Sequence, residues 1–451
     1  MSQRSTITIQ PESEEEKKRA LAIECPPDKS LTHRSLLFAG LAKGVSTLAN
    51  PLLGADCRTT LGALRELGVS GEVIEGVGTT EAGIRIDSPG WDGWKSPLKP
   101  LDFGNSGTTT RLMTGILAAT PGVFVTAWGD QSLSERPMGR VIEPLRRAGA
   151  HIVARDKGTK LPMAIEGRSL APCVHMSDKA SAQVKGALIF AGLNIDGETV
   201  VTLPRGSRDH SERALVNLGA QLAVEFHGSE ETIRVKGPFR PAPRDYRIPG
   251  DPSSAAFFQV WGALRSRGSI LIRNVLDNPT RTGFMRVLDR MGVSFVCEKN
   301  PEAHACVEPT FDVRVEGGQR LRPVDVEPEL VPTLIDEIPI LAVAASFAEG
   351  TSRFFGVGEL RVKESDRLKK TIELVNLAGE GRRAWAEGDQ LFVVGSPQAP
   401  QSFRYDPEED HRMAMASSIL AKTAQGACQV GDPQCVVVSF PEFFKFLNGF
   451  F

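Results

Sequence analysis

The sequence contains six copies of one unit of about 75 residues, and two separate glycine patterns mark these copies. In the first pattern a polar turn leads into an amphipathic helix, a glycine and usually a strand, as in "ERPMGRVIEPLRRAGAHIV". Glycine is favoured just past a helix end because it adopts positive φ easily. A chain with such internal repeats is expected to fold as an array of similar α/β units. The marker glycines are Gly68, Gly149, Gly219, Gly292, Gly379 and Gly449.

A second pattern interleaves with the first: a polar cluster, an Ala/Leu-rich helix, a glycine turn and a β-branched run. Each unit therefore has one amphipathic helix and one helix that is apolar on nearly all sides. Helices of the second kind belong inside a protein, so we expect buried helix bundles with amphipathic helices and sheets outside. The turn glycines follow one another at intervals of 71 to 82 residues, and they are Gly44, Gly122, Gly197, Gly268, Gly350 and Gly426.

Two proline-bearing segments, "ECPPDKS" and "YRIPGDPS", divide the six units into three and three. Segments of this composition are typical of domain boundaries. We expect one domain at residues 28–249 and a second at residues 1–27 and 250–451, with hinges near 25–28 and 247–252. A cleft between two such domains is the usual place for a ligand.

The charge balance excludes some classes of partner. Lys and Arg number 53 against 55 Asp and Glu, a net charge of −2, which favours neither nucleic acid nor an anionic membrane. Seven cysteines with no CxxC pair and no Cys/His cluster predict no metal site and a reduced, cytoplasmic protein. The N-terminal "PESEEEKKRA" is unlike a signal peptide, and no apolar run approaches the length of a membrane span.

Polar clusters stand at the start of the apolar helices. Helix N-termini carry unpaired N–H groups and a partial positive charge, so several of them around one cleft would hold anions. Ordinary N-capping is the alternative explanation for any single cluster. "GNSGTTTR" in particular is neither a Walker loop nor a dinucleotide motif. The clusters are Lys29, Ser30 and Arg34; Asn105, Ser106, Gly107, Thr108 and Arg111; Ser181 and Gln183; Asp251, Ser253 and Ser254; Asp336 and Glu337; and Asp410, His411 and Arg412.

Two further segments are rich in basic side chains. "LSERPMGR" places Arg136 before a proline that can start a helix. In "ELRVKESDRL", helical spacing would put Lys363 and Arg367 on one face with Glu364 one position round. A solvated, salt-bridged helix face is the alternative interpretation of this second segment.

Eight motifs together resemble the 5-enolpyruvylshikimate-3-phosphate (EPSP) synthase family, in order from about residue 26 to the C-terminus. The amino-acid sequences of three of these motifs are most similar to those of the bacterial class that includes naturally glyphosate-tolerant members. The resemblance implies an α/β fold of two domains, an inside-out barrel built from six βαβαββ repeats, with the active site in the interdomain cleft. The motifs are "DKSLTHRSL", "GNSGTTTRL", "ERPMGR", "SAQVKGALIFAGL", "GDPSSAAFF", "IDEIPILAVAA", "ELRVKESDRL" and "DHRMAM".

The family transfers the enolpyruvyl group of phosphoenolpyruvate to the 5-hydroxyl of shikimate 3-phosphate and releases phosphate, without metal or organic cofactor. The resemblance thus implies a monomeric transferase of the shikimate pathway, which leads to chorismate and the aromatic amino acids. For shikimate 3-phosphate it implies contacts from Lys29, Ser30, Arg34, Ser181, Ala182, Gln183, Arg208, Asp336 and Lys363. For phosphoenolpyruvate it implies contacts from Lys29, Asn105, Gly107, Arg136, Gln183, Arg367 and Arg412.

The implied chemistry is addition followed by elimination through a tetrahedral ketal. One group takes the proton of the 5-hydroxyl while another protonates the methylene carbon of phosphoenolpyruvate, and the roles then reverse. Asp336 is the candidate for the hydroxyl proton and Glu364 for the methylene carbon, and Lys29 is a candidate for either task. The alternative role of Asp336 is to cap the "EIPILAVAA" helix.

Three positions depart from the family pattern: Leu112 stands where proline is common, Ala182 where others carry Ser, and Ser439 where many carry Lys. These changes bear on glyphosate, which occupies the phosphoenolpyruvate subsite in this family. Gly107 leaves room for that inhibitor, whereas Leu112 and Ser439 alter the pocket and act in the opposite direction, and we expect measurable inhibition.

Two other functions remain open. The sister family that acts on UDP-N-acetylglucosamine usually has a loop cysteine and an early Lys-Asn pair, whereas here no cysteine lies between Cys57 and Cys173 and Lys29 precedes Ser30. A catalytically silent anion-binding protein on the same scaffold is the second alternative. Carboxylates at positions 336 and 364 argue against it, because simple anion binding needs no carboxylates.

Overall fold

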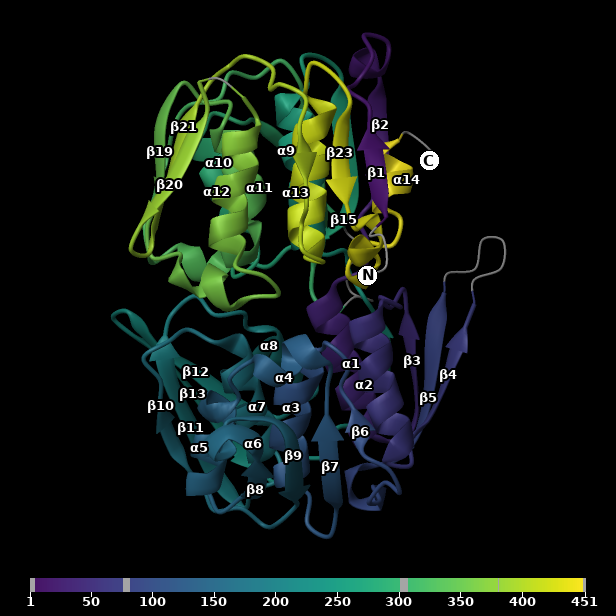
Figure 1. Ribbon diagram of the computed structural model, residues 1–451. Coiled ribbons are helices and arrows are strands. Elements are labelled where there is room, and N and C mark those ends of the chain that lie inside the picture. Colours follow the sequence, from purple (N-terminus) through teal and green to yellow (C-terminus); the bar gives the residue numbers. More distant parts are fainter. Residues whose placement is uncertain (1–4, 76–81, 301–306, 380, 449–451) are drawn as a thin grey trace. The chain divides into compact units, whose positions relative to one another are not determined.

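The computed structural model describes residues 5–75, 82–300, 307–379 and 381–448. The chain forms two compact units (Figure 1). Unit 1 comprises Met1–Pro26, Gly250–Ala303 and Pro309–Phe451, and unit 2 comprises Pro27–Pro249 and His304–Glu308. Two of the boundaries between them fall inside the proline-bearing segments noted above.

Unit 2 has three four-stranded sheets in its described part, and all three share one pattern. A short edge strand runs parallel to its neighbour, and the next two strands are antiparallel. In β5, buried Ile84 and Ile86 alternate with Arg85 and Asp87, as expected for a sheet with one face on the core. Across each sheet the strands are β14 (Asp245–Arg247), β3 (Lys43–Ala49), β5 (Gly83–Pro89) and β4 (Ser70–Ile74); β6 (Leu101–Asp102), β7 (Phe124–Trp128), β9 (Lys160–Glu166) and β8 (His151–Ala154); and β10 (Val174–Met176), β11 (Gly197–Pro204), β13 (Glu230–Gly237) and β12 (Gln221–His227).

The helices of unit 2 lie between the β10–β13 sheet and the β3–β5 sheet (Figure 1). Helices α1 (Lys29–Leu41), α3 (Gly107–Ala118) and α7 (Ala182–Gly192) are buried along most of their length. Helix α3 packs so closely on α7 that a Cβ atom at Gly115 would lie 2.0 Å from the carbonyl oxygen of Ala187. The other helices are α2 (Ala55–Glu66), α4 (Gln131–Glu135), α5 (Gly139–Arg147), α6 (Arg155–Gly158) and α8 (His210–Asn217).

Unit 1 repeats this architecture with two four-stranded sheets and one three-stranded sheet in its described part. The expected N-terminal strand is β1, which pairs antiparallel with β23. Strand β2 was not predicted from the sequence, and it runs parallel to β15. Across each sheet the strands are β16 (Phe295–Lys299), β17 (Thr310–Glu316), β15 (Ser269–Leu276) and β2 (Ala20–Glu24); β18 (Asp325–Val326), β19 (Gly350–Phe354), β21 (Gln390–Gly395) and β20 (Arg383–Glu387); and β1 (Thr6–Ile9), β23 (Cys428–Gly431) and β22 (Arg404–Tyr405).

The buried helices of unit 1 are α9 (Pro252–Leu264), α11 (Ile338–Ala345) and α13 (His411–Lys422), and they pack against one another. Figure 1 shows them between the β19–β21 strands and the strands β15, β2, β1 and β23. The buried bundles predicted from the apolar helices are thus confirmed in both units. The remaining helices of unit 1 are α10 (Gly283–Arg290), α12 (Arg367–Leu377) and α14 (Phe443–Leu447). Its 3-10 turns are η1 (Glu16–Lys18), η4 (Val331–Thr333), η5 (Ile335–Glu337), η6 (Gly358–Val362) and η7 (Pro433–Val438), and unit 2 has η2 (Trp91–Gly93).

The glycines that mark the ends of the amphipathic helices have the expected conformation at five positions. Each follows the C-cap residue of its helix, and the φ angles lie between 86° and 102°. The sixth marker, Gly449, lies outside the described residues. The five are Gly68, Gly149, Gly219, Gly292 and Gly379.

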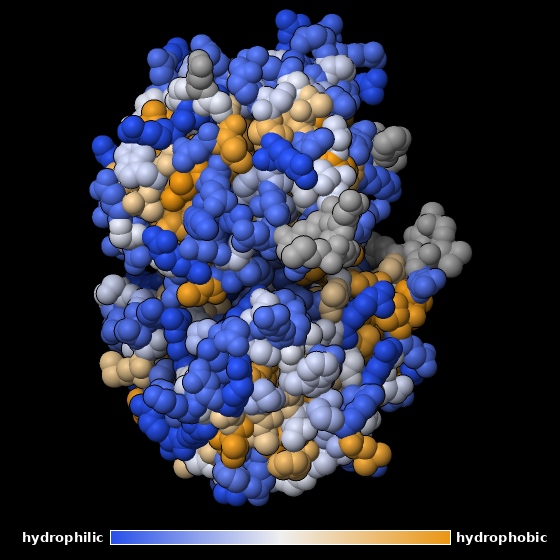
Figure 2. Space-filling model, in the orientation of Figure 1, coloured by the Kyte–Doolittle hydropathy of each residue, from blue (hydrophilic) through white to orange (hydrophobic). Residues whose placement is uncertain are grey.

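None of the helices in the described ranges combines the length and the apolar character needed to cross a bilayer. On the face drawn in Figure 2, hydrophilic residues predominate and apolar residues form separate groups.

Candidate active site

Side-chain caps hold the first turns of the three buried helices of unit 2. Asp28 accepts a hydrogen bond from the backbone N–H of Leu31 in α1 at 2.7 Å. Ser106 and Ser181 accept equivalent bonds at the starts of α3 and α7. The capping interpretation is therefore confirmed at the starts of these three helices.

Lys29, the first residue of α1, extends toward α2. Its Nζ atom lies 3.1 Å from Oδ2 of Asp56, and the two side chains are 19% and 14% exposed. Asp56 was not identified from the sequence, although its position in the first turn of α2 resembles that of the other helix-start polar groups.

Ser30, Arg34 and Arg208 connect α1 with α8. Arg34 Nε donates to Oγ of Ser211 at 2.8 Å, and Arg208 Nη1 donates to Oγ of Ser30 at 3.4 Å. Burial lowers the pKa of Arg34 to about 10, which leaves its guanidinium charged at neutral pH. The structure thus brings together three of the predicted anion-binding residues.

Asn105 and Gly107 flank the cap of α3, and Arg136 lies beside both. Arg136 Nη2 donates to Oδ1 of Asn105 at 2.7 Å, and a Cβ atom at Gly107 would lie 3.3 Å from Arg136 Nη1. Asn105 Nδ2 in turn donates to Asp130 Oδ2 at 2.6 Å, a partner that was not predicted. The helix after Arg136 begins at Gly139 instead of at the adjacent proline.

Gln183 links the first turns of α3 and α7. Its Oε1 atom accepts from Arg111 Nη1 at 2.5 Å, and its Nε2 atom donates to Oγ1 of Thr108 at 3.0 Å. Ala182, the first residue of α7, has no hydroxyl to offer at the same helix start. The predicted residues of α3 and α7 therefore form one polar group.

A buried charged cluster in unit 2 was missed in the sequence. Lys185 Nζ lies 2.5 Å from Glu212 Oε1 and 2.8 Å from Glu231 Oε1, and Lys185 is 1% exposed. Burial alone would lower the pKa of Lys185, but the two carboxylates raise it above its ordinary value. Ser207 donates to the same Glu231 oxygen at 3.0 Å and precedes Arg208 in the chain. The one signal for this cluster was a lysine inside an otherwise apolar helix.

In unit 1, Arg367 is the centre of the predicted site residues. Its Nε atom lies 2.8 Å from Asp410 Oδ2, Nη1 lies 3.1 Å from Asp336 Oδ1, and Nη2 lies 2.5 Å from Glu364 Oε2. Burial alone would lower the pKa of Arg367, but these three carboxylates raise it above its ordinary value. One guanidinium therefore contacts both carboxylates that are candidates for proton transfer, Asp336 and Glu364.

Asp336 is surrounded by positive charge. Lys363 Nζ lies 3.3 Å from its Oδ1 atom, and Arg412 Nη2 lies 3.9 Å from its Oδ2 atom. Arg412 also lies 3.5 Å from Oε1 of Glu337. The structure thus brings Asp336, Lys363, Arg367 and Arg412 together within unit 1.

One sequence expectation about these residues was wrong, and so was one alternative interpretation. Lys363 and Arg367 do not share a helix face, because α12 begins only at Arg367 and Lys363 follows the η6 turn. They meet at Asp336 instead. Asp336 is not the cap of α11 either, since the N-cap residue of that helix is Glu337 and it makes no side-chain cap bond.

Two of the positions that depart from the family pattern are interior. Leu112 is fully buried, and its Cδ2 atom lies 2.8 Å from where a Cβ atom at Gly186 of α7 would be. Ser439 is 2% exposed, and its Oγ has no hydrogen-bond partner among the described residues. Leu112 therefore fills space between α3 and α7.

One group of possible metal ligands occurs in the described part of the chain. Ligand atoms of Asp209, His210 and Glu308 lie within 4.8 Å of one another, and His210 Nδ1 is 2.6 Å from Glu308 Oε1. Arg213 Nε lies 2.8 Å from Asp209 Oδ2 and 3.7 Å from Glu308 Oε2. The arginine already supplies a positive charge to both carboxylates, so the group is explained without a metal.

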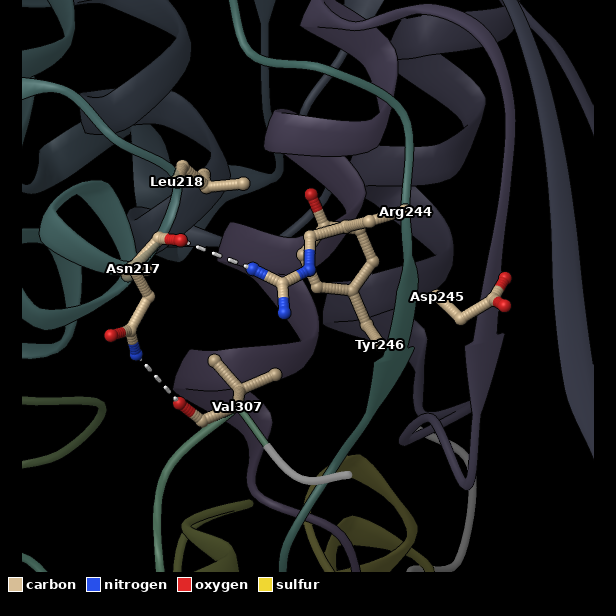
Figure 3. A pocket seen from close by; sticks show the side chains of 7 residues that line it. Asn217, Leu218, Arg244, Asp245, Tyr246 and Val307 are labelled. Carbon is tan, nitrogen blue, oxygen red and sulfur yellow. Dashed lines mark hydrogen bonds between the residues drawn. The ribbon is translucent and has the colours of Figure 1, made fainter. Parts of the chain in front are cut away.

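A small cavity of about 30 Å³ lies elsewhere in unit 2, between the end of α8 and β14 (Figure 3). Asn217, Arg244, Tyr246 and Val307 line it, and Arg244 Nη1 donates to the carbonyl oxygen of Asn217 at 3.5 Å. This volume is far below the few hundred Å³ of an ordinary ligand pocket. None of the predicted site residues lines it.

Comparison with known proteins agrees with the predicted family. The model of the EPSP synthase family (3-phosphoshikimate 1-carboxyvinyltransferase) matches residues 15–447. The 3-phosphoshikimate 1-carboxyvinyltransferase of a Synechococcus strain is 42% identical over 426 residues, 94% of this chain and 93% of that protein. The enzyme of the same name from Bacillus cereus is 39% identical over 429 residues, 94% of this chain and 95% of that protein.

Solved structures give the same result for the fold. EPSP synthase from Acinetobacter baumannii has a TM-score of 0.83 and 33% identity, and the match covers 98% of this chain and 97% of that one. The enolpyruvyl transferase NikO from Streptomyces tendae, at 16% identity and a TM-score of 0.72 with 99% and 97% coverage, shares the fold alone. The predicted two-domain α/β fold class is confirmed. Because the family model spans residues 15–447 and relatives are about 40% identical along nearly the whole length, this chain belongs to the EPSP synthase (3-phosphoshikimate 1-carboxyvinyltransferase) family.

Proposed function

We propose that this chain transfers the enolpyruvyl group of phosphoenolpyruvate to the 5-hydroxyl of shikimate 3-phosphate and releases inorganic phosphate. The observation that carries the proposal is the match to the family along residues 15–447. The polar groups of the two units add support, because two anionic substrates need several cations and helix N-termini.

Shikimate 3-phosphate is assigned mainly to residues of unit 2. Arg34 and Arg208, which both donate to Ser30 at the start of α1, offer charged donors for a phosphate, and Ser30 offers a hydroxyl. Ser181, Ala182 and Gln183 add the first turn of α7, whose free N–H groups favour an anion. Lys29, Asp336 and Lys363 complete the assignment with polar groups for the sugar-like ring.

Phosphoenolpyruvate is assigned to the arginines, which can bind both phosphate and carboxylate through two parallel hydrogen bonds. Arg136 lies beside Asn105 and Gly107 at the start of α3. Arg367 and Arg412 lie together in unit 1 around Asp336. Lys29 and Gln183 complete this assignment.

The reaction needs two balanced proton transfers. In the addition step the 5-oxygen bonds to C2 of phosphoenolpyruvate, Asp336 takes the hydroxyl proton, and Glu364 gives a proton to C3. In the elimination step C3 returns a proton to Glu364, the C2=C3 double bond reforms, the C2–O bond to phosphate breaks, and the proton held by Asp336 passes to the departing phosphate. Lys29 remains a candidate for either transfer. The common contact of both carboxylates with Arg367 supports their acting in one reaction.

The further properties follow the family. We propose that the protein works in the cytoplasm as a monomer, needs no metal or organic cofactor, and is inhibited by glyphosate at the phosphoenolpyruvate subsite. The two domains are assigned to residues 28–249 and to residues 1–27 with 250–451. The two compact units support this assignment.

The test is inorganic phosphate release from phosphoenolpyruvate mixed with either shikimate 3-phosphate or UDP-N-acetylglucosamine. Release with shikimate 3-phosphate alone is the expected result. Release with the nucleotide sugar alone would mean that the acceptor is wrong, and no release with either would favour a silent binding protein. Asp336→Ala and Glu364→Gln are expected to lower kcat strongly with little change in shikimate 3-phosphate binding.

A further inference from the structure

A buried row of side-chain hydrogen bonds runs from α1 to the cap of α3. His33 Nδ1 lies 2.7 Å from Oγ1 of Thr60 in α2, and that oxygen lies 2.7 Å from Oγ1 of Thr109. Thr109 Oγ1 is in turn 2.7 Å from Oγ of Ser106, which also accepts the backbone N–H of Thr109 at 3.2 Å. All four residues are 0% exposed. The row joins three helices without contact with solvent.

The imidazole of His33, at one end of this row, is uncharged at neutral pH. Burial lowers the pKa of His33 to about 3, and the charges of Lys29 and Arg34 act in the same direction while Asp56 opposes them. A neutral imidazole has one donor and one acceptor nitrogen. Nε2 has no hydrogen-bond partner among the described residues, so Nδ1 makes the one side-chain hydrogen bond described for this ring.

The hydrogen bonds of the row can run in either donor-to-acceptor direction. If Nδ1 carries the proton, it donates to Thr60, which donates to Thr109, which donates to Ser106. With the proton on Nε2, all three bonds reverse. In both cases each bond depends on the next, because Thr60 is the one link between His33 and Thr109. Loss of the Thr60 hydroxyl removes the described partner of His33 Nδ1 and leaves Thr109 with Ser106 as its remaining hydroxyl partner, a costly change in a low-dielectric interior.

The end of the row opposite His33 is Ser106, which lies in a segment assigned to a substrate. Ser106 stands between Asn105 and Gly107, which belong to the segment assigned above to phosphoenolpyruvate. Its oxygen sets the first turn of α3, and Arg136 contacts Asn105 in the same segment. A ligand-binding segment held from the interior by packed side chains has less freedom to misalign.

We propose that His33 is a positioning residue that fixes the Asn105–Gly107 segment for phosphoenolpyruvate through the hydroxyls of Thr60 and Thr109. The inference rests on the proposed function. His33 touches no substrate in this arrangement, and its effect passes through Thr60.

The first test is Thr60→Val, which keeps the shape of the side chain and removes only the hydroxyl. The KM for phosphoenolpyruvate should rise about tenfold, below the roughly hundredfold loss that a 1 Å misplacement can cause. The kcat and the KM for shikimate 3-phosphate should change little, because a uniform loss of binding raises KM alone. Thr60→Ser retains the hydroxyl and should behave as the wild type.

Thr114→Val is the matched control on α3. Thr114 is also fully buried, but its hydroxyl donates to the carbonyl oxygen of Thr110 at 2.6 Å and lies outside the row. This variant should lower Tm without changing the KM for phosphoenolpyruvate. If Thr60→Val lowers Tm in the same way and leaves that KM unchanged, the row is merely structural and the proposal fails.

A second pair of variants tests His33 directly and covers the case in which Thr60→Val does not fold. His33→Asn places a polar atom near the position of Nδ1 and should keep the KM for phosphoenolpyruvate, whereas His33→Phe should raise it. Equal KM values for the two variants would overturn the proposal. Wild-type enzyme is assayed alongside them: if it releases no phosphate from the two substrates, the proposed function has failed instead.

Discussion

Arg367 and Asp410 form a fully buried ion pair, with 2.8 Å between Nε and Oδ2 and with side chains that are 1% and 0% exposed. Asp410 also caps α13 through the backbone N–H of Arg412 and accepts a hydrogen bond from Ser365. Burial alone would raise the pKa of Asp410, but the guanidinium of Arg367 lowers it below its ordinary value. The carboxylate of Asp410 therefore contacts both Arg367 and Arg412, the two arginines of unit 1 assigned to phosphoenolpyruvate.

Asp410→Asn should destabilise the protein strongly. Asn still caps the helix, so the substitution removes mainly the charge and leaves Arg367 with less compensation in the interior. We expect the free energy of unfolding to fall by about 3–5 kcal/mol, the usual result of breaking a buried pair. Urea unfolding at pH 7 measures this. Glu364→Gln, at a partner that is 31% exposed, is the control and should cost about 1 kcal/mol or less. Equal losses would show that burial of the pair is not the cause.

Gly107→Ala and Gly115→Ala should separate a site effect from a packing effect on one helix. A Cβ atom at Gly107 would lie 2.8 Å from Nη1 of Arg111 and 3.3 Å from Nη1 of Arg136, both ends of flexible side chains. Stability should therefore change little, while the KM for phosphoenolpyruvate rises and inhibition by glyphosate weakens.

The Gly115 variant should behave in the opposite way. Its Cβ atom would lie 2.0 Å from a backbone oxygen of α7 that cannot move alone, so we expect a loss of at least about 3 kcal/mol or insoluble protein. Calorimetry and steady-state kinetics on both variants decide the matter. A Gly107→Ala enzyme with unchanged kinetics and unchanged inhibition would contradict the assignment of this segment.

The repeats and the helix starts could be predicted because their signals are local. Glycine after an amphipathic helix and a polar residue before an apolar helix each reflect the backbone needs of a few neighbouring residues. Strand β2 could not be predicted in this way. Its five residues follow a charged segment, and it is held by parallel pairing with β15, almost 250 residues along the chain. Tertiary pairing, not propensity, decides such a strand.

The same distinction applies to the site. The cations were predicted from motifs, but Asp56 and Asp130 were not, because their partners lie 27 and 25 residues away on other elements. Lys363 shows the opposite error: charge spacing suggested a helix, whereas the segment before Arg367 is not helical and the two cations meet through Asp336. Charge spacing in sequence identifies which groups converge only when the backbone between them is known.

His33 should make the protein less stable in acid. Its pKa is about 3 in the folded state against 6.5 for an ordinary histidine, so below pH 6.5 the unfolded chain binds a proton that the folded chain refuses. Stability is therefore lost as the pH falls from 6.5 toward 3, by about 1.4 kcal/mol per pH unit.

His33→Asn does not titrate and should lose this part of the pH dependence. Urea unfolding at about pH 6.5 and about pH 5.0 should show that the wild type loses about 2 kcal/mol more than the variant over this interval. Parallel pH profiles for the two proteins would mean that His33 keeps its ordinary pKa in the folded state, and a wild type that gains stability relative to the variant in acid would mean that folding raises this pKa.

Asp56→Asn should test how Lys29 is held. The ammonium of Lys29 has a carboxylate 3.1 Å away, and both side chains are mostly buried, so the pair is screened less than a surface pair. Removing the charge leaves Lys29 free to adopt other rotamers and adds net positive charge beside the substrates. We expect kcat/KM to fall about tenfold, a loss of about 1.4 kcal/mol in transition-state stabilisation. Asp87→Asn is the matched control, because the side chain of Asp87 is exposed, lies 3.8 Å from Arg85 of the same strand, and its loss should leave the kinetics unchanged. Wild-type kcat/KM in Asp56→Asn would show that Lys29 is positioned by the helix start alone, and equal losses in both variants would indicate a general effect of charge.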